Sequence, residues 1–242
     1  KEIKFIENMI KKIEPDEIYN LAAQSSVGKS FSNPMPTFES IVNGTINILE
    51  ASRDLQYQGK IFFAGSSEIF GNTKSGANVN HIQRPGSPYA IAKQTSFKLV
   101  EFFREVHNLK CMTGVLFNHE SQLRNEQFVT QKIIAGAIQS SINKSHKIQL
   151  GNINISRDWG WAEEYIEAMQ IMARSHEIKD QVICTGKLTT LKNFIEIAYS
   201  KFNLNWQDHV TINNLFKRKN DIKQSFGNPQ PLAEELKWKA KL

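Results

Sequence analysis

Lys60 to Gly71 reads KIFFAGSSEIFG, and this stretch decides the expected fold. Its first half is continuously apolar, as is the stretch CMTGVLF from Cys111 to Phe117. A strand that is apolar on both faces must have both faces covered by helices, which is the arrangement of parallel α/β sheets. The two stretches are therefore expected to be central strands of a doubly wound parallel sheet.

Helical patterns alternate with such strands along the chain, as they must where helices connect parallel strands. In the first of them Ile3, Ile6 and Met9 share one face, and Pro15 follows its end. Helices are predicted at 1–13, 37–53, 89–107, 128–142 and 159–174. Strands are predicted at 18–22, 60–67, 111–118 and 181–186, with a turn at 32–36 and a polar loop at 71–88.

Composition places the chain among ordinary globular proteins and indicates no nucleic-acid or membrane partner. Its 242 residues, 40% of them hydrophobic and 22% charged, suffice for one large domain or two small ones. A net charge of +6 would suit an anionic partner, but the lysines are scattered without a run of five basic residues, so we interpret it as compositional bias. Cys111 and Cys184 lie in apolar runs, and no stretch approaches 18 apolar residues, which favours a cytoplasmic protein with free thiols.

Ser87 to Lys93 reads SPYAIAK, which places Tyr89 and Lys93 four residues apart at the start of a predicted helix. That spacing puts both side chains on one helical face. An ammonium group beside a phenol favours the phenolate, so the pKa of Tyr89 is expected to be lowered and Tyr89 to act as a general base. The same pair occurs on many solvent-exposed helices, so it indicates a catalytic site only together with other residues.

Ser66 and Glu68, about twenty residues earlier, supply that context. Residues two apart on an extended segment point the same way, so the two side chains are expected to face one site. The ligand crevice of a parallel α/β sheet lies at the carboxyl ends of its strands, where this segment is expected. The alternative is that Glu68 is a solvent-exposed carboxylate on a loop.

Several stretches, taken in order, carry a resemblance to a known family. They are YNLAAQSSV, AGSSEIFG, SPYAIAK, LFNHES, FVTQKI, LGN and SRDWG. From Pro15 to Trp238 the chain resembles the GDP-mannose 4,6-dehydratases, members of the extended short-chain dehydrogenase/reductase group. The resemblance implies an incomplete Rossmann-like domain at 1–117 and 156–186, and a smaller nucleotide-sugar-binding domain at 118–155 and 187–242. It also implies NADP as cofactor, with NAD as the alternative, no metal, and a homo-oligomer, either a dimer or a tetramer.

Carried onto this sequence, the resemblance gives catalytic roles to Ser66, Glu68, Tyr89 and Lys93. The family usually has Thr at the position of Ser66, and both residues carry a hydroxyl. Tyr89 would take the proton of the sugar hydroxyl at carbon 4 while hydride passes to the nicotinamide, with Ser66 bonded to the same oxygen. Glu68 would then remove the proton at carbon 5, water would leave from carbon 6, and hydride would return to carbon 6.

The resemblance also implies which residues bind the two ligands. Cofactor contacts fall on Leu21, Ala22, Ala23, Gln24, Ser25, Tyr89, Lys93, His119 and Arg124. Substrate contacts fall on Ser66, Glu68, Tyr89, Asn118, Lys132, Arg157 and Arg218. Guanidinium groups suit a diphosphate through paired hydrogen bonds. Without the surrounding motifs, residues 21–25 would be a buried strand end and His119 a structural histidine.

The family's glycine-rich turn of the GxxGxxG kind, which binds the pyrophosphate at a helix N-terminus, is not found in this sequence. These residues alone are therefore expected to bind a dinucleotide weakly and to leave a sheet edge uncovered. The preferred explanation is that the chain is part of a longer protein; a segment supplied by another chain and a remnant without activity are the alternatives. Departures at Pro36, Leu123 and 218–221 lie around the sugar nucleotide and bear on the substrate rather than on the reaction type.

Two other functions stay open at this point. A nucleotide-sugar 4-epimerase or reductase would need Tyr89 and Lys93 but no base for carbon 5, so Glu68 distinguishes it from a dehydratase. A non-catalytic subunit would pair with a complete homologue through the helices at 37–53 and 89–107, which resemble those through which the family assembles.

Overall fold

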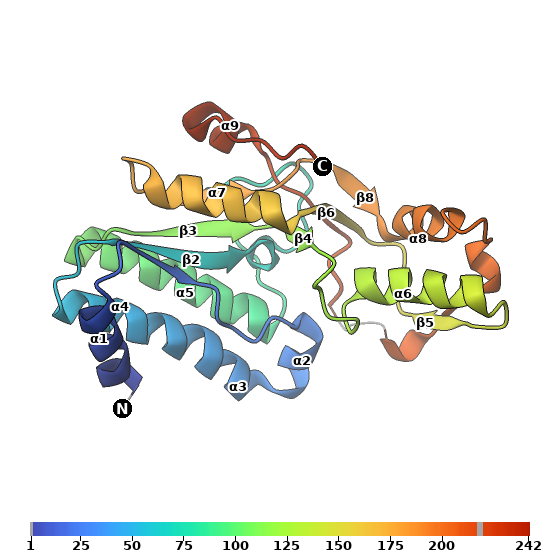
Figure 1. Cartoon of the computed structure of the whole chain (residues 1–242), viewed down its shortest axis with the longest axis horizontal. Helices are drawn as coiled ribbons and strands as arrows, with labels where there is room; N and C mark the ends of the chain where they lie inside the picture. Colours follow the sequence, from blue (N-terminus) through green and yellow to red (C-terminus); the bar gives the residue numbers. More distant parts are fainter. Residues whose placement is uncertain (1, 217–219) are drawn as a thin grey trace.

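The computed structural model describes residues 2–216 and 220–242, and Figure 1 shows its arrangement. Its α-helices are α1 (Glu2–Ile13), α2 (Val27–Ser32), α3 (Pro34–Phe38), α4 (Gly44–Asp54), α5 (Pro88–His107), α6 (Val129–Ile142), α7 (Ala162–Arg174), α8 (Leu191–Ser200) and α9 (Gln230–Leu236). Shorter helical turns are η1 (Glu39–Asn43), η2 (Ser67–Phe70), η3 (Trp206–Asp208) and η4 (Asn214–Phe216). The strands are β1 (Glu17–Asn20), β2 (Lys60–Ser66), β3 (Cys111–Leu116), β4 (Asn118–Glu120), β5 (Ile148–Leu150), β6 (Ser156–Trp161), β7 (Gln181–Ile183), β8 (Leu188–Thr190), β9 (Val210–Ile212) and β10 (Gln224–Ser225).

One parallel sheet, in the order β1-β2-β3-β7, forms the centre of the molecule. Helices α4 and α5 lie on one of its faces and α7 on the other (Figure 1). The prediction of a parallel α/β sheet with β2 and β3 at its centre is confirmed.

The uninterrupted apolar sequence of β2 follows from this two-sided cover. Ile61 and Phe63 pack into one core with residues of α4 and α5, such as Phe103. Phe62 points to the other face, where it packs with Met172 of α7. Because successive side chains of a strand point to opposite faces, each face of a covered sheet needs its own apolar residues.

Two smaller sheets lie beside the central one. In the first, β6 pairs in parallel with β4 and β10 and antiparallel with β8; in the second, β5 pairs with β9. Helices α6 and α8 pack with the second sheet around Ile133, Ile195 and Tyr199. The C-terminal residues return to the central sheet, where Leu232 and Trp238 join the core under α7. Since those two residues fall in the expected substrate domain, the division into domains stays a prediction.

Three predicted elements differ from the structure by more than the position of a strand end. The expected turn at 32–36 is reduced to Asn33, which separates two short helices: Ser26 caps α2 by accepting from Lys29 N at 3.3 Å, and Pro34 begins α3. The expected helix at 37–53 is interrupted by a π-helical turn, η1. Residues 159–161 belong to β6, where they pair with 118–120, and α7 begins only at Ala162. Helical periodicity cannot reveal a pairing between segments so far apart in the sequence.

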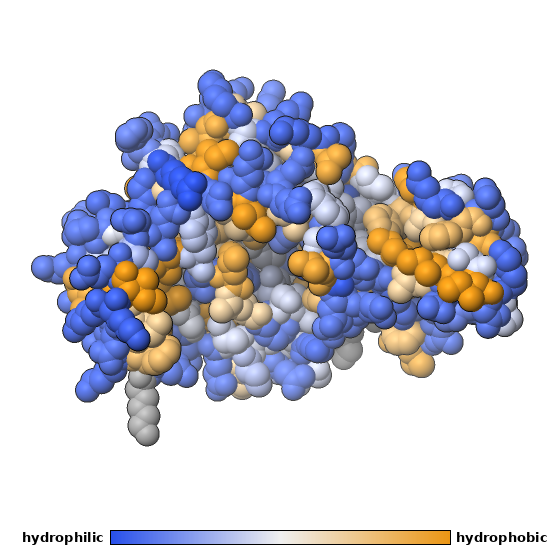
Figure 2. Space-filling view, in the orientation of Figure 1, coloured by the Kyte–Doolittle hydropathy of each residue, from blue (hydrophilic) through white to orange (hydrophobic). Residues whose placement is uncertain are grey.

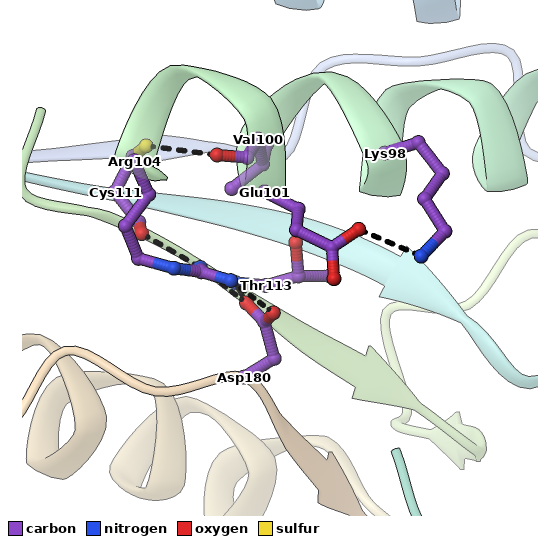
Figure 3. A network of polar contacts seen from close by, with 7 residues as sticks. All are labelled: Lys98, Val100, Glu101, Arg104, Cys111, Thr113 and Asp180. Carbon is purple, nitrogen blue, oxygen red and sulfur yellow. Dashed lines mark hydrogen bonds and ion pairs between the residues drawn. The ribbon is translucent and has the colours of Figure 1, made fainter. Parts of the chain in front are cut away.

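An ion pair ties α5 to the amino ends of β3 and β7 (Figure 3). Arg104 donates to both carboxylate oxygens of Asp180, at 2.9 and 2.7 Å, and to the carbonyl of Cys111 at 3.0 Å. Asp180 also accepts from the backbone N of Thr113 at 2.6 Å. This network lies at the opposite end of the strands from Ser66 and Leu116, so it is part of the scaffold and not of a site at the carboxyl ends.

The surface is mainly hydrophilic, with smaller apolar areas between the polar ones (Figure 2). On α6, Ile134, Ile138 and Ile142 are exposed at helical spacing, and on α5 Ile91, Phe102 and Val106 are exposed. Among the helices of residues 2–216 and 220–242, none combines the length and the apolar character that crossing a bilayer would require.

Candidate active site

A cavity of about 580 Å³ opens at the carboxyl ends of β2 and β3. Ser66 and Leu116, the last residues of these strands, lie in its wall, and so does the start of α5. Residues 149–152 and 155, which lie in and after β5, also line it. The cavity thus lies where parallel α/β proteins bind their ligands, and its size suits a small-molecule ligand.

Ser66 and Glu68 both line this cavity. Ser66 ends β2 in an extended conformation, and its hydroxyl accepts from Glu68 N at 3.3 Å. That hydrogen bond caps the short 3₁₀ helix η2, so Glu68 stands in a helical turn and not on an extended strand as the sequence argument assumed. The two side chains share the cavity because of this cap and not because of strand alternation.

Tyr89 and Lys93 enter the cavity from the first turns of α5. Ser87 caps the helix by accepting from Ala90 N at 3.1 Å, and Pro88 occupies its first turn. The ammonium of Lys93 donates to the carbonyl of Ala64 at 2.7 Å and lies 5.9 Å from the centroid of the Tyr89 ring. Lys93 is 5% exposed, and burial lowers its pKa to about 8.

The electrostatic environment of Tyr89 differs from the sequence-based expectation. Burial raises the pKa of the phenol to about 12; the Glu68 carboxylate raises it further, while the Ser66 hydroxyl and the Arg124 cation oppose the change. The prediction that Lys93 lowers the pKa of Tyr89 is therefore wrong: burial and the surrounding side chains together raise it. The reason is that Lys93 is itself desolvated and directs its donor to the β2 backbone.

His119 lies in β4 at the edge of the cavity. Its Nδ1 donates to the carbonyl of Phe117 at 2.9 Å, and its ring stacks on Tyr165 with centroids 5.0 Å apart. Burial lowers its pKa, which keeps the imidazole neutral and leaves Nε2 as an acceptor.

Two predicted cations, Arg124 and Lys132, lie beside aromatic rings in the cavity wall. The Arg124 guanidinium carbon is 3.8 Å from the centroid of the Phe128 ring, and the Lys132 ammonium is 5.0 Å from that of Phe216. Each cation is therefore held over a ring face rather than extended into solvent.

Of the remaining predicted substrate residues, Asn118 and Arg157 line the cavity, and Arg218 lies outside the described residues. Arg157 is 5% exposed and donates to the carbonyl of Ile222 at 2.8 Å. It therefore joins β6 to the segment before β10 as well as facing the cavity.

Only part of the predicted cofactor segment, residues 21–25, faces the cavity. Leu21, Ala23 and Ser25 line the cavity, whereas Ala22 and Gln24 are not among its lining residues. The Gln24 amide donates to the carbonyl of Ser26 at 2.9 Å and to the hydroxyl of Thr37 at 3.1 Å, and its oxygen accepts from Ser26 N. Gln24 thus braces the loop that carries its neighbours.

Several lining residues were not predicted as site residues. They are Glu120, Gln127, Phe128, Gln149, Asn152, Trp159, Phe216 and Asp221, among others. Glu120, Phe128, Asn152 and Trp159 stand inside the motifs LFNHES, FVTQKI, LGN and SRDWG, so their position in these motifs was the available signal. Phe216 and Asp221 carry no such signal.

The parallel sheet with a cavity at its carboxyl edge places the protein in the class with a Rossmann-like fold, which solved enzymes share. The dTDP-glucose 4,6-dehydratase DesIV from Streptomyces venezuelae, solved as a double mutant with NAD and DAU bound, has a TM-score of 0.88 at 16% identity, over 99% of this chain and 72% of that one. RMD from Pseudomonas aeruginosa, complexed with NADPH, has a TM-score of 0.82 at 21% identity, over 94% and 77% of the two chains.

Sequence comparison identifies the family within that class. The model of the family described as GDP-mannose 4,6 dehydratase matches residues 1–242, so the chain belongs to this family. GDP-mannose 4,6 dehydratase 1 from Arabidopsis thaliana is 38% identical over 234 residues, which are 95% of this chain. The chain spans 65% of the length of that relative.

Proposed function

We propose that the protein containing these residues is a nucleotide-sugar 4,6-dehydratase that converts GDP-mannose to GDP-4-dehydro-6-deoxy-mannose. The observation that carries the proposal is the meeting of Ser66, Glu68, Tyr89 and Lys93 in one cavity at the carboxyl edge of the sheet. An epimerase needs no base besides the tyrosine, whereas a dehydratase needs a second one, and Glu68 fits that role.

The donors and acceptors of the cavity fit a nicotinamide dinucleotide, NADP in this proposal and NAD as the alternative. Lys93 carries three N–H donors, is buried, and has the Ala64 carbonyl as an acceptor, so its other donors suit ribose hydroxyls. The small residues Ala23 and Ser25 leave room for a nucleotide beside the strand ends. When bound, such a cofactor supplies a hydride acceptor and a positive charge in the cavity.

Tyr89, Ser66 and Glu68 then divide the proton transfers between them. Tyr89 accepts the proton of the carbon 4 hydroxyl as the hydrogen at carbon 4 leaves as hydride, and Ser66 orients that hydroxyl. The resulting ketone acidifies carbon 5, and Glu68 accepts the carbon 5 proton. The hydroxyl at carbon 6 takes up one of the two protons held by Tyr89 and Glu68 and leaves as water, which creates a double bond between carbons 5 and 6. Carbon 6 then receives the hydride and carbon 5 the second proton, so both residues return to their starting state. The dinucleotide ends each cycle in the state in which it began.

Two cations of the cavity wall, Lys132 and Arg157, support a diphosphate-linked sugar as substrate. Lys132 lines the cavity from α6, Arg157 from β6, and Asn118 from the start of β4. Cationic side chains that face a cavity suit phosphate oxygens. The choice of GDP-mannose rests on membership of the family.

We also propose a homo-oligomer, a dimer or a tetramer, that assembles in the cytoplasm. Ile91, Phe102 and Val106 are exposed on α5, and a second subunit docked on this helix would cover them. Cys111 and Cys184 are free and buried, as suits a reducing compartment.

The test is the Glu68→Gln variant of the protein that contains residues 1–242, assayed with GDP-mannose. The proposal requires loss of dehydration while hydride still passes from carbon 4 to the cofactor, seen as an absorbance of reduced nicotinamide at about 340 nm that appears on addition of substrate and persists. Unchanged turnover would instead favour a 4-epimerase or a reductase. Failure of the unmodified protein to turn over any nucleotide sugar would overturn the enzymatic proposal.

A further inference from the structure

Glu120 is a cavity-lining carboxylate to which the dehydratase reaction assigns no role. It ends β4, and its side chain is 18% exposed. Burial raises its pKa, and the nearby Arg124 cation and then the Thr130 hydroxyl oppose that shift. A carboxylate withdrawn from water in this way is costly unless it interacts with another group.

Arg124 is the charged group that faces Glu120. Its Nε lies 3.4 Å from Oε2 of Glu120, an ion-pair distance across one turn of chain. On the other side, its guanidinium carbon lies 3.8 Å from the centroid of the Phe128 ring. The guanidinium is therefore held at two points, by charge at Nε and by the ring at its face.

This arrangement leaves the two terminal nitrogens of the Arg124 guanidinium available to a ligand. Within residues 2–216 and 220–242, no protein acceptor forms a hydrogen bond with the terminal nitrogens of Arg124, and the residue lines the cavity. Two parallel N–H donors presented together match the geometry of a phosphate group. Their direction is fixed only as long as Nε and the ring face are held.

We propose that Glu120 is a positioning residue that, with the Phe128 ring, orients Arg124 so that its terminal nitrogens bind a phosphate group of a nucleotide in the cavity. This proposal rests on the proposed function, which supplies two nucleotides. Either the cofactor or the sugar nucleotide can be the source of the phosphate, and the probes NADP⁺ and GDP distinguish them.

The test is a double-mutant cycle on the protein that contains residues 1–242. Dissociation constants for NADP⁺ and for GDP are measured by calorimetry for Glu120→Gln, Arg124→Ala and the double variant. Glu120→Gln keeps the shape of the side chain and removes its charge, and we expect it to weaken one of the two nucleotides about tenfold, as coupling between contacting residues allows. Arg124→Ala weakens the same nucleotide at least as much, and the double variant binds it as Arg124→Ala does.

Two further comparisons separate positioning from a general structural role. Glu126→Gln removes a charge from the same loop outside the cavity and leaves both dissociation constants unchanged. Phe128→Tyr keeps the ring and preserves binding, whereas Phe128→Leu does not. The KM of Glu120→Gln rises for the affected nucleotide, while kcat at saturation stays within about twofold, because the reacting groups are untouched.

Additive effects of Glu120→Gln and Arg124→Ala would overturn the positioning role while leaving the dehydratase proposal intact. So would a loss of kcat at saturation with unchanged affinity. If the unmodified protein bound neither NADP⁺ nor GDP, both the positioning role and the proposed function would be rejected.

Discussion

The Lys93 ammonium donates to the main-chain carbonyl of Ala64 at 2.7 Å, while the Tyr89 ring centroid lies 5.9 Å away from it. The lysine therefore attaches α5 to the end of β2 and lies near the phenol without being hydrogen-bonded to it. It bears on Tyr89 through the position of the helix, and its buried charge has a cost of its own.

That cost predicts an unusual pH dependence of stability. Burial lowers the pKa of Lys93 from 10.5 to about 8, so between these values the folded protein binds fewer protons at this site than the unfolded chain does. Stability then rises with pH across that window. The Lys93→Met variant has no group that titrates at this position and serves as the reference. Relative to it, the free energy of unfolding of the unmodified protein should increase by on the order of 2–3 kcal/mol between pH 8 and pH 10.5. Urea denaturation of both proteins at several pH values measures the difference, and a difference independent of pH contradicts the prediction.

Ser66 should control the pH at which Tyr89 becomes a base. Burial raises the Tyr89 pKa to about 12, and the Ser66 hydroxyl counteracts this. In Ser66→Ala the counteracting group is gone, so the ascending limb of the pH-rate profile should move to higher pH and the rate at pH 7 should fall by roughly tenfold or more. Ser66→Thr retains a hydroxyl and should retain the profile. Equal profiles for Ser66→Ala and Ser66→Thr would show that the hydroxyl does not act on the phenol.

Stability should depend on the Arg104 and Asp180 pair far more than on the Lys98 and Glu101 pair of the same helix (Figure 3). Asp180 is 9% exposed and accepts hydrogen bonds from both α5 and β3. Asp180→Asn should therefore lower the free energy of unfolding by about 2–4 kcal/mol. Lys98 is 59% exposed, and Lys98→Ala should cost less than about 1 kcal/mol. Thermal unfolding compares the two, and similar losses would contradict this ranking.

The parts of the fold that the sequence could predict are those governed by local patterns. The two-faced apolar run from Ile61 to Phe63 predicts a central strand, because each face of a covered sheet needs apolar residues of its own. The strand 159–161 was missed because its partner, 118–120, is nearly forty residues away, and such pairing leaves no periodic signal. Long-range strand pairing depends on the whole fold.

In the site, residue types and spacing predicted which side chains could react but not their electrostatics. Tyr89 and Lys93 were found from a spacing of four, yet the direction of the Tyr89 pKa shift was wrong, because desolvation depends on packing that spacing does not describe. Glu120 was missed because its importance depends on where the chain places Arg124 and Phe128.

Gln24 should support dinucleotide binding without touching the ligand. Its amide donates to Ser26 O and to the Thr37 hydroxyl, and Gln24 N donates to the Ser40 hydroxyl at 3.3 Å, which joins the cavity loop to the helices after it. Gln24→Glu replaces the side-chain NH₂ donor by a carboxylate oxygen, so the two hydrogen bonds to Ser26 and Thr37 are lost. The loop that carries Ala23 and Ser25 should then be less rigidly held, and NADP⁺ binding should weaken by roughly tenfold. Gln58→Glu, on an exposed turn with a hydrogen bond to Gln56 O, is the matched control and should bind normally. Calorimetric titration decides between them, and unchanged affinity in Gln24→Glu would mean that the loop keeps its shape without this brace.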